Sequence, residues 1–299
     1  MRRAPVSSQR AAGLSVASNS TLIAVKLVLG LWTASVSVIS EALHSLVDLV
    51  ASLIALYSVR KSAQPEDEDH PFGHGKFESI SGAVEALLIF LAAGAIFYQA
   101  GHALLLGHFL HTPLGGLIAM GVSMLVNWVV SAWLYRVATD NQSIALEADA
   151  LHLRYDVYTC AGVFVGMGVI AIAGLRGLDL KWLDPLLGIM VALVVVRAAY
   201  RLTRKSLEDL VDTRLPKEEM ERLMEILEAN SALGIRFHRV RARRAGPLRH
   251  IDLHVEMSPE LTVQKAHDIC DHLEQDITAS LPRARVLIHA EPIEDGGRD

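Results

Sequence analysis

Residues 40–48 read SEALHSLVD and residues 148–156 read ADALHLRYD, and each stretch lies inside a long apolar run. Each carries a histidine and an aspartate four residues apart: His44 with Asp48, and His152 with Asp156. Residues at this spacing share one face of an α-helix, with Cβ atoms about 5–6 Å apart. Two such faces, opposed, would supply two imidazoles and two carboxylates around one point. That tetrahedral N₂O₂ set suits Zn²⁺.

The competing interpretation is that these four residues are solvated near helix ends or form a structural polar network. A charged group at the centre of a bilayer costs about 2.5–3.5 kcal/mol on the insertion scale. Two helices carry this cost with the same residue spacing, which indicates that the residues have a function and favours a metal site. The charges also fit transport, because two carboxylates balance one Zn²⁺ and the two histidines can take up protons when the metal leaves.

The long apolar runs predict a membrane domain. The chain has 299 residues, of which 52% are apolar, and nearly all long apolar runs precede about Leu202. A bilayer core of about 30 Å needs about 20 apolar residues per helix. Lys and Arg are concentrated in the loops on one side of the predicted membrane, the side that also holds both termini. This predicts an inner (plasma) membrane protein with both termini cytoplasmic. Six stretches qualify as spans: Ala11–Thr33, Val36–Tyr57, Ile80–Leu106, Pro113–Leu134, Ser143–Ala173 and Leu183–Ala199.

The segment after Ser206 is charged and predicts a soluble domain in the order helix, strand, strand, helix, strand. Within 248–257, apolar and polar residues alternate, which is the period of a half-buried strand. Thr262 is expected to cap the helix that runs to Ser280. The predicted fold is a six-helix transmembrane domain (1–205), a linker (206–214) and an α+β ferredoxin-like (αββαβ) cytoplasmic domain (215–299).

With its six spans, paired motifs and αββαβ tail, the chain resembles the cation diffusion facilitator family over nearly its whole length. The resemblance implies a homodimer in the lipid bilayer that exports divalent metal in exchange for protons. Members with His and Asp on both helices look like the zinc-selective ones. Several bacterial members have Asp at the position of His44, and those also take cadmium.

The segment 67–76, DEDHPFGHGK, predicts a second metal site. Two histidines four residues apart beside carboxylates form a reasonable ligand cluster, and the nearby glycines let side chains converge. The alternative is a solvated acidic loop. The segment is similar to the family's loop whose upstream Asp and two His bind metal, which here implies Asp67, His70 and His74.

Four of the six histidines of the tail lie on four different predicted elements, and one of these, His289, shares a strand face with Glu291. The resemblance implies that they form a binuclear metal site at the dimer interface. The family usually has Asp at the position of Glu291, whose longer side chain would alter the bridging geometry. The resemblance also implies that Lys76 pairs with Asp212. The implied tail ligands are His238, His254, His267, His289 and Glu291.

Several other functions find no support in the sequence. A net charge of −5 leaves no basic footprint for nucleic acid. The chain has no P-loop for nucleotide, and no HExxH or GxSxG motif for catalysis. Zn²⁺ is therefore expected as cargo and structural ligand, with protons as the counter-ion.

Two alternatives stay open: export of Cd²⁺, Fe²⁺, Mn²⁺ or Co²⁺, and a membrane metal sensor that does not transport. A sensor needs ligands only in the tail, so the paired intramembrane residues favour transport. A further intramembrane residue, Lys26, is expected to snorkel or to pair with a carboxylate such as Glu85.

Overall fold

The structure is a computed structural model that describes residues 6–32, 36–106, 114–176, 178, 182–231 and 234–293. The chain divides into two compact units, Met1–Leu207 and Glu208–Asp299.

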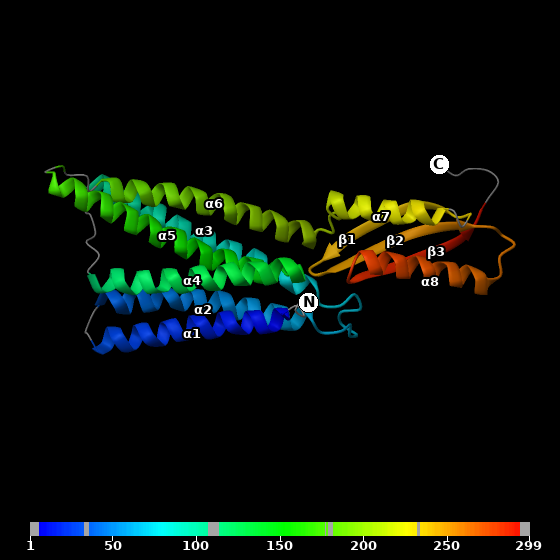
Figure 1. Cartoon of the computed structure of the whole chain (residues 1–299), viewed down its shortest axis with the longest axis horizontal. Helices are drawn as coiled ribbons and strands as arrows, with labels where there is room; N and C mark the ends of the chain where they lie inside the picture. Colours follow the sequence, from blue (N-terminus) through cyan, green and yellow to red (C-terminus); the bar gives the residue numbers. More distant parts are fainter. Residues whose placement is uncertain are drawn as a thin grey trace, which may run out of the picture. The chain divides into compact units, whose positions relative to one another are not determined.

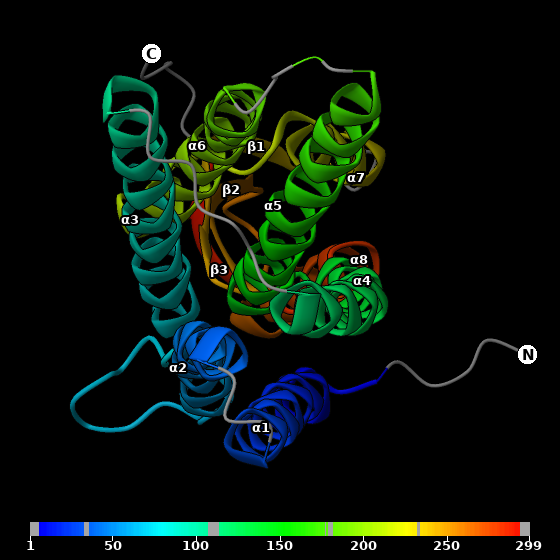
Figure 2. The ribbon, with the colours of Figure 1, turned by 90° about the vertical axis from the view of Figure 1, so that its left-hand side faces the viewer.

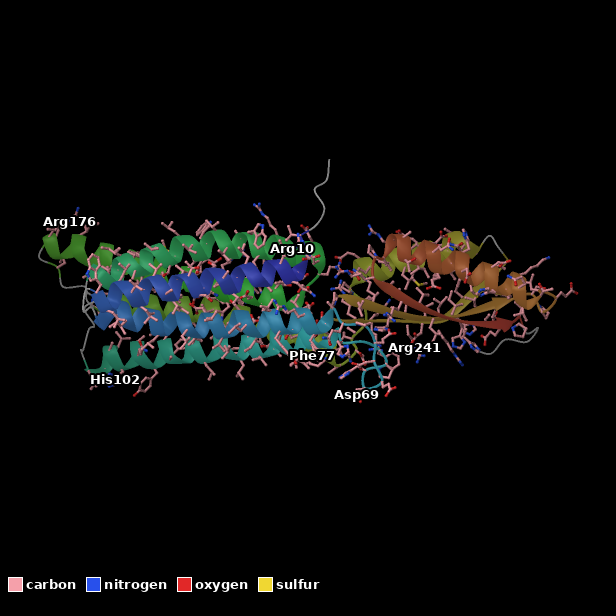
Figure 3. The ribbon with its side chains drawn as sticks, turned by 90° about the horizontal axis from the view of Figure 1, so that it is seen from below. Arg10, Asp69, Phe77, His102, Arg176 and Arg241 are labelled. Carbon is pink, nitrogen blue, oxygen red and sulfur yellow. The ribbon has the colours of Figure 1, made fainter. Side chains whose placement is uncertain are left out.

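The first unit is a bundle of long helices (Figures 1 and 2). Among the described residues, five of them are long and apolar enough to cross a membrane. The remaining one, α2, carries Glu41 and Asp48 within its apolar run. Arg10 and Phe77 lie at one end of the bundle, and His102 and Arg176 lie at the other (Figure 3). The helices are α1 (Ser8–Trp32), α2 (Val36–Ser62), α3 (Lys76–Leu106), α4 (Leu114–Asn141), α5 (Ile144–Leu175) and α6 (Leu183–Leu210).

Small residues fill the helix contacts of this bundle. One buried cluster joins α1, α2, α4 and α5 through residues such as Ala11 and Ala145. A second cluster joins α3, α5 and α6 through residues such as Ala86, Ala148 and Ala199. Large apolar side chains on most of these helices point outward. Lipid is as apolar as these side chains, so membrane helices associate through close packing of small residues.

The second unit is a three-stranded sheet with two helices, in the order α7 (Lys217–Asn230), β1 (Arg236–Ala245), β2 (Leu248–Met257), α8 (Val263–Ser280) and β3 (Ala284–Pro292). The central strand β2 runs antiparallel to β1 and parallel to β3. Alternate residues of β2, such as Ile251 and Leu253, are buried in one core with Leu223 of α7 and Ile277 of α8. Both helices therefore cover the same face of the sheet.

The structure confirms the predicted fold class: a six-helix unit followed by an αββαβ tail. It also confirms the predicted cap of α8, because the Thr262 side chain accepts a hydrogen bond from the backbone N–H of Lys265. That bond satisfies one of the N–H groups that a helix leaves unpaired in its first turn.

Candidate metal sites

The first cluster lies within the membrane helices, where α2 supplies Asp48 and α5 supplies His152 and Asp156. Their potential ligand atoms all lie within 4.8 Å of one another. His152 Nε2 is 3.3 Å from Asp48 Oδ1, and both side chains are buried. The side chain of His44 lies outside the described residues, so its role stays a prediction. One imidazole and two carboxylates at this separation are a donor set that could hold a divalent metal ion.

A hydrogen-bonded network from three helices supports this cluster. Asn19 of α1 donates Nδ2 to the Asp48 carbonyl at 3.3 Å and to Ser52 Oγ at 2.7 Å. Ser52 in turn donates Oγ to Asp149 Oδ1 at 2.9 Å. Such outer partners hold metal ligands in position. This role of Asn19 and Ser52 was not predicted from the sequence, although a polar residue inside a membrane span is itself a signal of function.

Glu85, the example given for a carboxylate partner of Lys26, does not pair with it. Lys26 Nζ donates to Ser45 Oγ at 2.7 Å, while Glu85 accepts a hydrogen bond from Ser81 Oγ at 3.3 Å. The two residues come from helices whose rotation decides which polar groups meet, and hydropathy does not reveal that rotation.

The second cluster lies in the loop between α2 and α3 and consists of the three predicted residues, Asp67, His70 and His74. Asp67 reaches both histidines, with Oδ1 3.1 Å from His70 Nδ1 and Oδ2 3.2 Å from His74 Nε2. The His74 side chain is 1% exposed, and its Nδ1 lies 3.1 Å from the Pro65 carbonyl. When Nδ1–H donates to that carbonyl, Nε2 keeps its lone pair for a metal.

The backbone and the charges of this loop favour an ionised ligand. Gly73 has φ of 81°, a conformation that L side chains rarely adopt, so glycine is needed at this turn. Loss of hydration acts to raise the pKa of Asp67, but hydrogen bonds from His70 and the charges of His74 and His70 outweigh it and lower that pKa. The lowered pKa favours the ionised form of Asp67, which is the form that binds metal.

The third cluster lies on the tail sheet. The strands bring His238 of β1, His254 of β2 and Glu291 of β3 together, with ligand atoms within 4.8 Å. In the strand register His254 lies opposite both His238 and His289. Glu291 contacts all three histidines, at 2.7 Å from His238 Nε2, 3.5 Å from His254 Nδ1 and 3.7 Å from His289 Nε2. Its longer side chain thus places one carboxylate among three imidazoles.

One predicted ligand of the tail site, His267, lies away from this cluster within a single chain. His267 lies on α8, where its Nε2 is 3.5 Å from Asp271 Oδ2, and it is not among the residues that gather around Glu291. Asp212 Oδ1 accepts from Arg243 Nη1 at 2.7 Å. The pairing of Asp212 with Lys76 stays a prediction.

The sequence analysis missed one acidic neighbour of this third cluster. Glu256 Oε1 lies 3.5 Å from His238 Nδ1, and Glu256 is paired with Glu291 in the strand register. The available signal was its position two residues after His254, which places both side chains on the same face of β2.

Comparisons with known proteins cover the whole chain. The model of the cation efflux transmembrane domain matches residues 13–211, and that of the cation efflux protein cytoplasmic domain matches residues 215–293. The transporter sll1263 of Synechocystis is 35% identical over 263 residues, which are 88% of this chain and 83% of its own. The cation-efflux pump FieF of Klebsiella pneumoniae is 32% identical over 284 residues, covering 95% and 92%. A solved structure of CzrB in its zinc form is 31% identical over 28% of this chain and 97% of its own, with a TM-score of 0.27.

Proposed function

Because the chain belongs to the cation efflux family, we propose that it exports Zn²⁺ from the cytoplasm, by alternating access, in exchange for protons. Family membership makes it a multi-pass membrane transporter that moves divalent cations, with a cytoplasmic C-terminal domain, and not an enzyme. The choice of zinc and of protons is the proposal.

The buried cluster of Asp48, His152 and Asp156 is the observation that carries the proposal. Its donors are one imidazole and two carboxylates, and His44 would complete a four-ligand site. Zn²⁺ readily takes mixed nitrogen and oxygen ligands in tetrahedral geometry. Two carboxylates also neutralise the ion, which lowers the cost of holding it in a medium of low dielectric constant.

Metal and proton compete for the same atoms in this cluster, and this competition supports exchange. A protonated His152 forms an ion pair with Asp48, 3.3 Å away. Zn²⁺ binds only neutral imidazole, so its arrival displaces that proton and its departure lets a proton return. If the transporter changes sides only when this cluster holds either metal or protons, it moves metal out and protons in.

We further propose a homodimer in the inner membrane, with both termini cytoplasmic, in which the tail cluster responds to zinc. Glu291 and the histidines around it are partly exposed on the sheet and can accept metal without unfolding. His267, which lies apart from them within one chain, would join the cluster across the dimer contact. We propose a structural or regulatory role for the loop cluster, because its ligands lie outside the helices.

Flux measurements on reconstituted vesicles test the function. Vesicles that hold the purified chain should take up zinc when their interior is more acidic than the medium, because protons then leave as zinc enters, and Asp48→Asn should remove the uptake. A panel of Zn²⁺, Cd²⁺, Fe²⁺, Mn²⁺ and Co²⁺ tests the cargo. Binding of zinc without flux of any ion would contradict the proposal and favour a sensor.

A further inference from the structure

Two carboxylates inside the bundle are not among the potential ligands of the metal cluster. Glu85 of α3 and Asp149 of α5 are both 0% exposed. Glu85 Oε1 accepts from Ser81, and Asp149 Oδ1 accepts from Ser52. The second oxygens, Glu85 Oε2 and Asp149 Oδ2, are buried and accept no hydrogen bond from any residue in the described part of the chain. Each carboxylate therefore leaves one oxygen available to a small ligand.

The two side chains are near one another across the contact between α3 and α5. Their chain neighbours, Ala86 and Ala148, pack in the same buried cluster. The charges of Glu85 and Asp149 interact directly. Asp149 is also close enough to Asp48 and His152 to interact with their charges.

No cation within the described residues forms an ion pair with either carboxylate. Lys26 donates to Ser45, and Lys205 pairs with Glu147 near the end of the bundle. The other buried carboxylate of α3, Glu78, differs because it accepts hydrogen bonds from Ser62 and Ser143. Two unpaired carboxylates held together away from water cannot both stay ionised unless positive charge is added nearby, so without metal the pair must hold a cation.

We propose that Glu85 and Asp149 form a proton-binding pair separate from the metal cluster, and that Glu85 carries a proton which zinc binding releases. The inference rests on the proposed exchange of metal for protons. A proton fits the observations better than a second metal, because the oxygens are fully buried and the pair adds no nitrogen ligand. The pair would then contribute protons to the exchange beyond those that bind His152.

The structure also supplies the coupling between the two sites. Asp149 lies one helical turn before His152, so the two side chains share a face of α5. Asn19 bonds both the Asp48 carbonyl and Ser52 Oγ, and Ser52 bonds Asp149. Zn²⁺ in the cluster brings two positive charges close to Asp149 and stabilises it as a carboxylate. The positive charge that Zn²⁺ adds to the cluster therefore weakens the binding of the proton to the pair, and the proton on Glu85 leaves more readily.

Counting protons tests this pair. The full-length protein is titrated with zinc in buffers of different ionisation enthalpy, which gives the protons released per zinc bound. Glu85→Gln keeps the shape of the side chain but removes its exchangeable charge. We expect Glu85→Gln to bind zinc in the same stoichiometry and to release fewer protons, by up to about one per chain. The matched control is Glu147→Gln, which changes a carboxylate of α5 that is partly exposed and paired with Lys205, and it should release as many protons as the wild type.

The possible results separate this inference from the proposed function. Equal proton release by wild type and Glu85→Gln overturns the proton pair and leaves the exporter intact. Loss of one bound zinc in Glu85→Gln makes the pair a metal site and also overturns the proposal. A wild type that releases no protons and moves no metal contradicts the proposed function itself.

A second measurement needs no variant that might fail to fold. Infrared spectra of the wild type in lipid, with glutamate labelled by ¹³C in the side-chain carboxyl group, report protonated glutamate through its C=O stretch. The band should be present near neutral pH without metal and should fall when zinc is added. A spectrum without the band, or a band that zinc does not change, overturns the proposal.

Discussion

His152 Nε2 lies 3.3 Å from Asp48 Oδ1, although the two residues are 104 positions apart in the chain. Asp156 supplies a third ligand one turn further along α5. The contact joins α2 to α5 at a buried point, and it is the contact that Zn²⁺ would have to open in order to bind. The first prediction follows from removing its charge.

Asp48→Asn keeps the size of the side chain but takes away one negative charge and an anionic ligand. Zinc would then carry an unbalanced positive charge in a medium of low dielectric constant. Even loss of an outer partner costs about 10–100-fold in affinity, so we expect zinc flux to fall by at least about 100-fold. The measurement is uptake into vesicles, with Asp140→Asn, an exposed carboxylate at the end of α4, as control. Near-normal flux in Asp48→Asn would exclude the cluster as the transport site.

The loop cluster should lose metal in acid because of its histidines and not because of Asp67. The lowered pKa of Asp67 keeps it ionised below the range in which carboxyl groups usually titrate. His70 and His74 bind metal only as neutral imidazoles, so protons compete with the metal for them and affinity should fall on acidification while Asp67 is still ionised. Calorimetry on a protein that carries both Asp48→Asn and Glu291→Gln measures the loop with the transport site and the tail cluster weakened. Affinity that persists until carboxyl groups titrate would show that the histidines are not ligands.

Much of this architecture is readable from the sequence because it follows from local periodicity. Apolar length predicts the helices, the alternation in β2 predicts its buried face, and Thr262 caps α8 as expected. Pairs four residues apart, such as His152 and Asp156, must share a helix face whatever the tertiary fold.

The rest depends on how the elements pack, which periodicity does not fix. The rotation of α1 decides that Lys26 meets Ser45 and that Asn19 meets Asp48. Strand register decides that Glu256 joins the tail cluster, while the position of α8 takes His267 away from it.

Zinc should strengthen the dimer through the tail, and Glu291 should be needed for it. Glu291→Gln removes the one carboxylate that contacts three imidazoles, so metal at this cluster would lose its anionic ligand. We expect the zinc-dependent fraction of dimer to fall by about 10-fold or more. Light scattering and cross-linking of the full-length protein, with and without zinc, measure it, and Glu260→Gln is an exposed control. Unchanged zinc-dependent dimerisation would mean that the dimer does not use this cluster.

The tail should also lose stability in acid through Glu219. Partial burial acts to raise the pKa of Glu219, but hydrogen bonds and charge from Arg249 and Arg244 outweigh it and lower that pKa. A carboxyl group whose folded-state pKa is lowered stabilises the fold above its ordinary pKa. That contribution is lost as pH falls through the lowered value.

Glu219→Gln tests this ion pair, because it leaves the buried Arg249 without its counter-charge. We expect the free energy of unfolding near neutral pH to fall by about 1–3 kcal/mol. Since the tail has its own core, urea unfolding of residues 208–299 measures it. The difference between wild type and variant should shrink as pH falls below the ordinary carboxyl range. A difference that does not change with pH would assign the effect to packing and not to charge.

Selectivity gives the last prediction, which concerns the fourth ligand. With His44 the site holds two imidazoles and two carboxylates, and its charge with a divalent ion is zero. His44→Asp replaces a nitrogen ligand by an oxygen ligand and makes the loaded site −1. More oxygen ligands and more negative charge favour larger or harder cations over zinc. We therefore expect His44→Asp to keep zinc flux and to gain Cd²⁺ or Mn²⁺ flux. The pH dependence should shift as well, because a carboxylate takes up its proton in more acid conditions than an imidazole. The measurement is the ratio of Cd²⁺ to Zn²⁺ flux in vesicles at several pH values. If that ratio is the same in wild type and variant, the packing around Asp48 and His152, and not the identity of residue 44, must select the ion.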